Sequence, residues 1–254
     1  MNKDERDSIE SVLALTVVGA ENITGTTGDD LITGTYTDGG TGTFNNTDTI
    51  IGDEGIDTLS INIGAVAITP ADSYWSGVSG IEKLEFNSTG AGAQTLTTGA
   101  DFNTAFTAAG VDLTMQTLEG AINLDMATVP FTGAATIHTT TIGAGAHTIT
   151  TGSGVATVQA TGLAAGAQTI KGAGLTTVDA TINGAGDQVI GDGAGNGLNL
   201  TTVNATILGA GAQTITSTST SNVAVTAAAA SGAQTIVTGS GNDTVTVTTA
   251  AGQV

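Results

Sequence analysis

The heptapeptide Gly209-Ala-Gly-Ala-Gln-Thr-Ile215 recurs, in variant form, through most of this 254-residue chain. The other copies are GAGAQTL at 90–96, GAGAHTI at 143–149, AAGAQTI at 164–170, GAGDQVI at 184–190 and SGAQTI at 231–236. From Gly145 to Gly232, the glycine two residues before the Gln (or its His replacement) advances in steps of 21, 20, 25 and 21 residues. A period of this length predicts a solenoid, in which each unit buries its apolar face only by stacking on its neighbours.

Each unit contains two short stretches in which apolar and polar residues alternate, separated by glycine-rich corners, as in QTI at 168–170 and LTTVDAT at 175–181. Thr and Val favour strands, and Gly permits the turns between them. Aromatic residues are only 3% of the chain, too few for a large globular core. We therefore expect an all-β fold, a β-solenoid like a parallel β-helix with about 20–21 residues per coil, in which Ile and Val face inward and Thr, Gln and Asn face outward.

Composition divides the chain into four stretches of what we expect to be one continuous body. They are a lead-in at 1–12, either a short helix or disordered, an acidic β segment at 13–61, an irregular β segment with loops at 62–130, and regular repeats at 131–254. Residues 250–254 resemble the opening of a further unit and show no polar cap, so we expect either that the chain is truncated at its C-terminal end or that this open edge pairs with another chain.

Charge is strongly unbalanced, with 23 acidic and 4 basic residues and a net charge of −19. Nucleic-acid binding requires patches of Lys and Arg, so this balance argues against it. It favours bound cations, above all Ca²⁺, which takes oxygen ligands. Twelve acidic residues lie in 1–61 and four in 131–254, so we expect cation binding to be concentrated at the N-terminal end.

Cysteine is absent, which excludes disulfides and thiolate metal sites. The early apolar run at 12–20 follows acidic residues and therefore lacks the positive flank of a secretory signal peptide. No apolar run approaches the roughly 18 residues of a membrane span, so we expect none. Export would then depend on another signal, for instance one at the C-terminus.

Three stretches fit the calcium-binding nonapeptide G-G-x-G-x-D-x-U-x, in which glycines form a corner, Asp binds Ca²⁺ and U packs inward. They are 25–32, 52–60 and 238–245. From these stretches and their neighbours we predict metal ligands at Asp29, Asp30, Asp48, Asp53, Asp57, Asn242 and Asp243. The alternative interpretation is that these are turn residues without an ion, because an isolated copy supplies only half a site.

Other polar and aromatic side chains favour structural roles. His138 and His147 have no neighbouring Cys, and we expect solvated positions for both rather than metal binding or base catalysis. Tyr74 and Trp75 mark a loop; packing is the main interpretation, and a sugar-stacking platform is the alternative.

Enzymatic machinery is not evident in the sequence. Glu82 and Glu85 are expected on opposite sides of an alternating strand, as solvated groups rather than an acid–base pair. Nucleophile triads and phosphate-binding loops are not recognisable, and only four basic residues are available to bind an acidic polysaccharide substrate. We therefore expect no enzyme activity.

Residues 13–61 resemble the opening of the RTX-like, calcium-binding surface-layer proteins that Gram-negative bacteria export by type I secretion. VSGIEKLEF at 78–86 is similar to a strand of that family, and the units LTTVDATI and LTTVNATI extend the resemblance over most of the chain. The resemblance implies an extracellular β-solenoid that folds with Ca²⁺ and assembles with itself into a lattice or filament, with cell-surface polysaccharide as a further candidate partner. Two family features, tandem nonapeptides and a recognisable C-terminal secretion signal, are missing here.

These observations favour a structural, self-assembling surface protein in which Ca²⁺ supports folding and assembly. A secreted adhesin or a module that binds glycan or ice through exposed Thr rows is the alternative. Coil lengths of 20, 21 and 25 residues predict a Thr array too irregular for ice.

Overall fold

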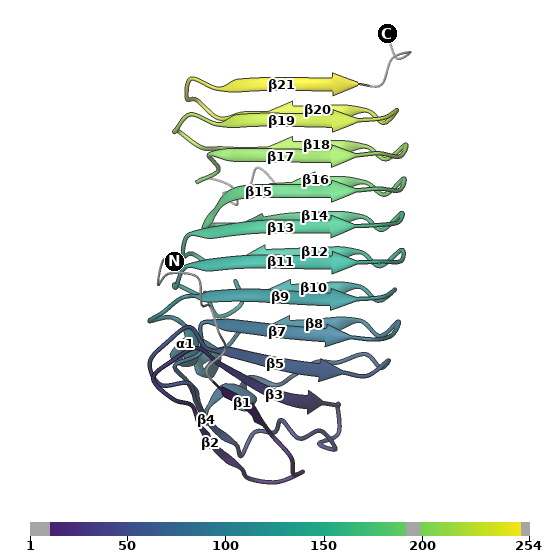
Figure 1. Ribbon diagram of the computed structural model, residues 1–254. Helices are drawn as coiled ribbons and strands as arrows, with labels where there is room; N and C mark the ends of the chain where they lie inside the picture. Colours follow the sequence, from purple (N-terminus) through teal and green to yellow (C-terminus); the bar gives the residue numbers. More distant parts are fainter. Residues whose placement is uncertain (1–10, 192–198, 250–254) are drawn as a thin grey trace, which may run out of the picture.

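In the computed structural model, which describes residues 11–191 and 199–249, the chain is an all-β solenoid of about nine turns. Figure 1 shows the coils stacked one on another from the N-terminal end to the C-terminal end. Two sheets run along the stack, and a smaller one lies at the N-terminal end. The predicted fold class is confirmed.

The long sheet has eleven strands among the described residues, all in chain order. They are β1 (Ser11–Ala14), β3 (Asp30–Tyr36), β5 (Thr58–Ile63), β7 (Lys83–Ser88), β9 (Val111–Thr117), β11 (Ala135–Thr141), β13 (Ala156–Gly162), β15 (Leu175–Ile182), β17 (Thr202–Ile207), β19 (Ala224–Ala229) and β21 (Thr244–Thr249).

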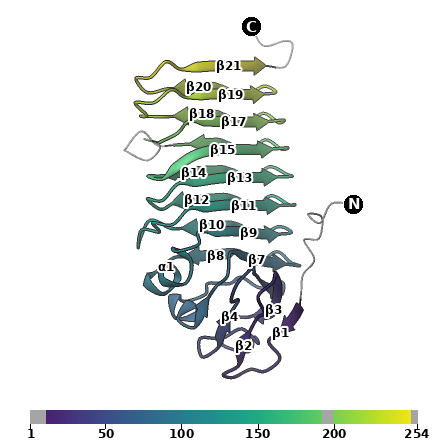
Figure 2. The same ribbon diagram turned by 60° about the vertical axis from the view of Figure 1, so that its left-hand side comes forward.

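The short sheet lies opposite the long sheet in the coils from β7 onward. Its described strands are β8 (Gln94–Thr97), β10 (Ile122–Asp125), β12 (His147–Thr151), β14 (Gln168–Gly172), β16 (Gln188–Ile190), β18 (Gln213–Thr216) and β20 (Gln234–Val237). The small sheet is formed by β2 (Asn22–Thr24), β4 (Thr49–Ile51) and β6 (Val78–Ser79). Figure 2 shows α1 (Ala100–Phe106) beside the N-terminal half of the stack, and a 3₁₀ helix, η1 (Asp72–Trp75), contributes to the same region.

Strand structure begins earlier than the sequence suggests. β1 starts at Ser11, so residues 11 and 12 belong to the first coil rather than to the expected lead-in. The rest of that lead-in, residues 1–10, and the expected opening of a further unit at 250–254 lie outside the described residues.

Glycine occupies the corner of the repeat because neighbouring coils touch there through their backbones. A Cβ added to Gly166, Gly186, Gly211 or Gly232 would lie 2.0, 2.3, 2.0 or 1.7 Å from the carbonyl oxygen of the equivalent glycine one coil earlier. No side chain fits at such distances, so the periodic glycine is a packing requirement of the stack.

The expectation that the repeat Gln faces outward is wrong. Gln168, Gln188 and Gln213 are buried, and they form a ladder through the interior. The Nε2 of Gln188 donates to the Oε1 of Gln168 at 2.9 Å, and Gln213 and Gln234 continue the chain of bonds at 2.8 Å each. Gln168 lies two residues before the inward-facing Ile170, and alternate residues of a strand point to the same face. The alternation of the strand, and not the polarity of the side chain, therefore sets the inward direction of Gln168. Burial is tolerated because each amide both donates and accepts along the stack.

His147 occupies the same ladder position, and the expected solvated location is likewise wrong. Its ring is buried. The hydroxyl of Thr139 lies 2.7 Å from Nδ1, and that of Thr141 lies 2.8 Å from Nε2. Desolvation lowers the pKa of His147 from 6.5 to about 4, so this histidine is neutral in the folded protein at neutral pH.

His147→Gln should therefore remove part of the acid sensitivity of the fold. In the unfolded chain His147 gains a proton below pH 6.5, whereas in the folded protein it stays neutral down to about pH 4. The contribution of His147 to the free energy of unfolding is therefore fully present above pH 6.5 and is lost as the pH falls to 4. We expect the wild type to lose up to about 3 kcal/mol more than the variant over this range, measured by urea unfolding. The carboxylates titrate in both proteins, so their effect cancels in the difference between wild type and variant. If the free energy of unfolding had the same pH dependence in both proteins, the prediction would be contradicted.

Tyr74 and Trp75, expected in a loop, end the 3₁₀ helix η1 and pack into an aromatic cluster. Trp75 is 1% exposed, and its ring centroid lies 5.4 Å from those of Phe44 and Phe102 and 5.8 Å from that of Phe106. A buried indole cannot serve as a platform for a sugar, so the packing interpretation of this loop is confirmed for Trp75.

Candidate functional site

Carboxylates line the corner at which the first strands of the long sheet begin. Ser11, Asp30, Asp57 and Glu82 stand one above another on successive coils. The amide of Ser11 donates to Asp30 Oδ1 at 3.0 Å, that of Asp30 to Asp57 Oδ1 at 2.8 Å, and that of Asp57 to Glu82 Oε2 at 2.9 Å. We call Asp29, Asp30, Asp57 and Glu82 the acidic corner.

The carboxylates of Asp30, Asp57 and Glu82 each take the place of a backbone carbonyl as the acceptor for an amide of the preceding coil. In later coils the same position holds Val111 and Ala135, whose amides donate to the carbonyls of Ala134 and Val155, at 2.9 Å each. At the acidic corner a side chain from the next coil provides the acceptor instead. The carboxylates therefore have a structural role that requires no ion.

Two of the predicted ligands, Asp30 and Asp48, have both carboxylate oxygens engaged by protein donors. Asp30 accepts from Ser11 and from the amide of Thr26, and the hydrogen bond from the Ser11 hydroxyl is the main cause of its lowered pKa. Asp48 accepts from the amides of Glu21 and Asn45 at 3.0 and 2.8 Å, yet burial raises its pKa.

Asp57 differs because one of its oxygens is unpaired. Its side chain is 0% exposed, and Oδ2 has no hydrogen-bond partner. Burial raises the pKa of this carboxyl, and the charges of Glu82, Asp30 and Asp29 raise it further. An orphaned carboxylate oxygen among like charges is the arrangement that a bound cation would stabilise.

The space beside Gly52 brings that oxygen near a backbone carbonyl. A Cβ added to Gly52 would lie 2.4 Å from Asp57 Oδ2 and 1.7 Å from the carbonyl oxygen of Gly80. Carboxylate and carbonyl oxygens are the ligands that Ca²⁺ takes. Asp57 Oδ2 and the Gly80 carbonyl are thus two oxygens of the type that Ca²⁺ takes. Asp30 Oδ2 has the same place beside Gly25 and the Gly52 carbonyl, but it accepts a hydrogen bond from the amide of Thr26.

The remaining predicted ligands lie elsewhere. Asp29 Oδ1 accepts from the amide of Ile56 at 2.8 Å, and Asp53 is exposed with a left-handed φ of 81°. Asp243 accepts from the amide of Val223 at 2.9 Å at the far end of the solenoid, where Asn242 donates through its backbone. The structure therefore does not unite the seven predicted residues in one site. Within 11–191 and 199–249, it contains no group of three or more His, Asp or Glu side chains placed to hold a metal.

Glu82 and Gly80 were missed by sequence reasoning, which placed Glu82 on a solvated strand face. β7 begins at Lys83, so Glu82 lies in the corner instead. A local signal exists: Gly80-Ile-Glu82 repeats Gly55-Ile-Asp57 after 25 residues, one coil later.

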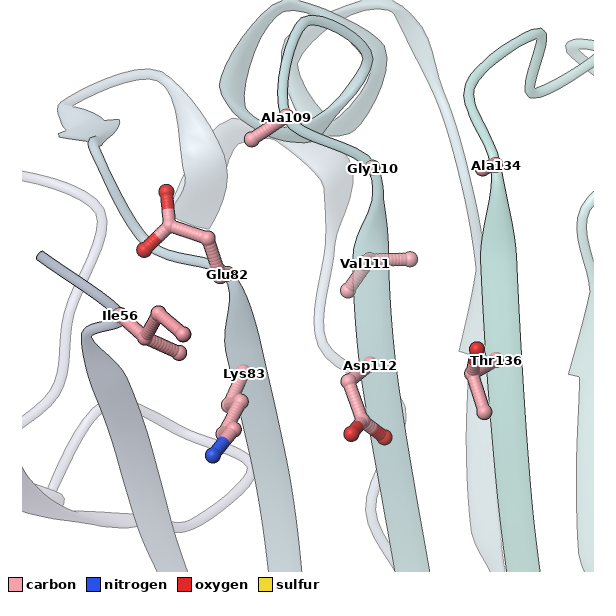
Figure 3. Close-up of a pocket in the computed structure, with 9 residues that line it drawn as sticks. All are labelled: Ile56, Glu82, Lys83, Ala109, Gly110, Val111, Asp112, Ala134 and Thr136. Carbon is pink, nitrogen blue, oxygen red and sulfur yellow. The ribbon is translucent and has the colours of Figure 1, made fainter. Parts of the chain in front are cut away.

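A second candidate is a shallow hollow of about 260 Å³ over β7, β9 and β11. Figure 3 shows Lys83 and Asp112 side by side on neighbouring strands, with Glu82 extending away from them. His138, half-exposed as expected, lies 3.2 Å from Asp112 through its Nε2. Ile56 and Val111 add apolar surface. The hollow offers opposite charges to a small polar group, but Lys83 is exposed to solvent, which weakens such contacts.

Comparisons of the chain with protein-family models, with curated proteins and with solved structures found no match. Among the described residues, no helix is both long and apolar enough to cross a bilayer.

Proposed function

We propose that this chain is a structural protein of the bacterial cell surface that assembles with copies of itself and acts without catalysis. The observation that carries the proposal is the continuous stack itself, in which eleven parallel strands of the long sheet follow one another in chain order among the described residues. Hydrogen bonds between the side chains of Gln168, Gln188 and Gln213 join successive coils in its interior.

Apolar surface and unpaired strand edges both favour association. An edge strand presents free N–H and C=O groups that pair readily with another chain. Contact between copies would also bury apolar surface, with a gain of about 25 cal/mol per Å². Repetition of a stiff stack suits a surface layer or filament.

The test is electron microscopy with light scattering, carried out in millimolar Ca²⁺ and again after chelation. We expect ordered assemblies in Ca²⁺ and fewer after chelation. Monomers under both conditions would contradict the proposal.

Calcium is the second part of the proposal, and the Asp57 corner supports it. The unpaired Oδ2 of Asp57 and the carbonyl of Gly80 would bind the ion, which would neutralise charge at a buried position. Extracellular calcium modules have Kd values of about 0.1–1 mM. At about 100 times Kd, the ion would stabilise the folded state by about 2.7 kcal/mol.

Asp57→Asn should abolish this calcium effect. We expect Ca²⁺ to raise the Tm of the wild type and of Asp48→Asn, but not that of Asp57→Asn. Asp48 is the matched control because it is also buried at the acidic end and has both oxygens occupied by backbone amides. Thermal unfolding and titration calorimetry measure the effect; an equal shift in all three proteins would show that calcium binds elsewhere.

An adhesin or ice-binding module is the second candidate, and the regularity of the long sheet favours it. The outward positions carry two rows of paired Thr residues, at 136, 157, 177 and 202 and at 140, 161, 181 and 206, with one irregularity in the pairing just before Thr157. The irregular array expected from unequal coil lengths is thus corrected. β15 and β17 keep this register although 25 residues separate Thr177 from its partner Thr202. Thermal hysteresis and a glycan array test this candidate.

A further inference from the structure

We propose that two copies of the chain associate side by side, antiparallel, through a row of exposed aliphatic side chains along one edge of the solenoid. The inference rests on the self-assembly proposed above and names one contact through which it would occur. The row lies at the corner that follows the long-sheet strands, where Figure 1 shows the chain turning toward the short sheet. We call it the corner ridge, and it is formed by Leu118, Ile142, Leu163 and Leu208.

Backbone hydrogen bonds hold these residues one above another. Each amide donates to a carbonyl of the preceding coil, as that of Leu163 does to Thr141 at 2.9 Å. Asn183 and Leu208 continue the row with bonds of 2.8 Å each. The row therefore has one residue per coil and spans about 19 Å from Leu118 to Leu208, four coil steps of about 4.8 Å.

The aliphatic side chains of the ridge are open to solvent although coils cover them on both sides. The ridge positions follow β9, β11, β13 and β17, and each of these strands pairs with a strand above and a strand below. Asn183 shows that a polar side chain fits the same position, so folding does not require an aliphatic one there. Single exposed aliphatic residues are ordinary, but a continuous row marks an interaction site. The exposed fractions are 36% for Leu118, 44% for Ile142, 44% for Leu163 and 60% for Leu208.

The chemistry of the ridge selects a second copy of the chain as its occupant. The corner segments IGAGA at 142–146, LAAGA at 163–167 and LGAGA at 208–212 contain no charged residue. Two copies with a net charge of −19 each can therefore meet here without bringing carboxylates together. A second ridge also presents aliphatic groups at the same spacing. An anionic membrane, by contrast, would repel the acidic chain.

The distribution of charge sets the orientation of the two copies. Twelve of the 23 acidic residues lie in 1–61, so a parallel pair would place both acidic ends side by side at a repulsive cost. An antiparallel pair places them at opposite ends. With Leu163 at the two-fold axis, Leu118 of one copy faces Leu208 of the other, and Ile142 faces Asn183. This register keeps all four aliphatic residues in the contact.

The contact is short, which sets its expected strength. A standard protein interface buries about 800 Å² on each partner, more than a single row of side chains provides. We therefore expect a weak pair that gains strength when copies are already held in a layer or filament, because linked contacts add.

Leu163→Lys tests the ridge, with Val155→Lys as the matched control. Val155 is 64% exposed and directly precedes β13, whereas Leu163 directly follows it, so the two residues lie at opposite corners of one coil. In millimolar Ca²⁺ we expect sedimentation equilibrium to show a concentration-dependent dimer of the wild type. Leu163→Lys should weaken this dimer at least about 10-fold, because it places an unpaired charge in the contact. Val155→Lys should leave it unchanged, and circular dichroism should match in all three proteins.

Single-cysteine variants test the orientation, because the chain has no Cys. With a short bifunctional thiol reagent, we expect Leu163→Cys to cross-link to itself and a mixture of Ile142→Cys with Asn183→Cys to give mixed dimers. Asn183→Cys alone should cross-link far less, because its counterpart lies two coils away. If Asn183→Cys cross-linked to itself as fully as Leu163→Cys, the copies would be parallel and the proposal overturned.

The outcomes also separate this inference from the self-assembly on which it rests. Ordered assemblies that persist unchanged in Leu163→Lys under the electron microscope would overturn the corner ridge and leave self-assembly standing. Wild-type monomers by sedimentation, cross-linking and microscopy would overturn both.

Discussion

Gly211→Ala is expected to destabilise the solenoid strongly, although it adds one methyl group. The new Cβ would lie 2.0 Å from the carbonyl oxygen of Gly186 and 2.6 Å from its carbonyl carbon. On the other side, Gly232 approaches the Gly211 carbonyl in the same way. Relief of the clash requires two coils to separate, which would weaken the strand pairing of both sheets. We expect a loss of about 2–4 kcal/mol in the free energy of unfolding.

Gly64→Ala is the matched control. A Cβ at Gly64 meets nothing within 4 Å, and its backbone is not left-handed. Reduced freedom of the unfolded chain should then leave this variant unchanged or more stable by up to about 1 kcal/mol. Urea unfolding, with hydrogen exchange to locate the damage, makes the comparison. Equal stability of the two variants would mean that the glycine corners are not in contact.

The solenoid could be predicted because the repeat period and the strand alternation can both be read directly along the sequence. The glycine spacing predicts stacking, and strand alternation predicts which of Ile170 and Thr169 faces inward. The same alternation also places Gln168 inward, yet its polarity suggested solvent. The repeat also places a second Gln at the same position one coil away, and the hydrogen bond between the two amides makes the burial tolerable.

The acidic corner was predicted only in part, for a related reason. Asp30 and Asp57 share a motif but differ in their free oxygens. The difference depends on backbone donors: the amide of Thr26 reaches Asp30, while the equivalent Asp53 has a left-handed backbone and leaves Asp57 Oδ2 unpaired. Such pairing is set by the three-dimensional register of neighbouring coils, which motif spacing does not specify.

Gln188→Leu should destabilise the fold, because it breaks the row of hydrogen-bonded glutamines in the interior. Gln188 donates to Gln168 Oε1 at 2.9 Å and to the carbonyl of Ala180 at 3.1 Å, and it accepts from Gln213 at 2.8 Å. Leucine would leave three polar groups without these partners in a dry interior. Each unsatisfied group costs about 1–3 kcal/mol, so we expect a loss of about 3–5 kcal/mol by urea unfolding.

The chain itself contains one such interruption. Ile122 occupies the ladder position next to Gln94, and the Oε1 of Gln94 is buried without a partner. An aliphatic side chain thus fits the space, which makes lost hydrogen bonding, rather than steric clash, the cause of the expected effect.

Gln234→Leu supplies the control, because Gln234 is only half-buried and donates to Gln213 alone within the ladder. We expect it to cost about 1 kcal/mol. The double variant Gln188→Leu/Gln213→Leu should cost less than the sum of the single variants by about 0.5–3 kcal/mol, because it removes both members of one hydrogen bond. Strict additivity would show that the amides are held independently, and a small effect of Gln188→Leu would place this side chain in contact with water.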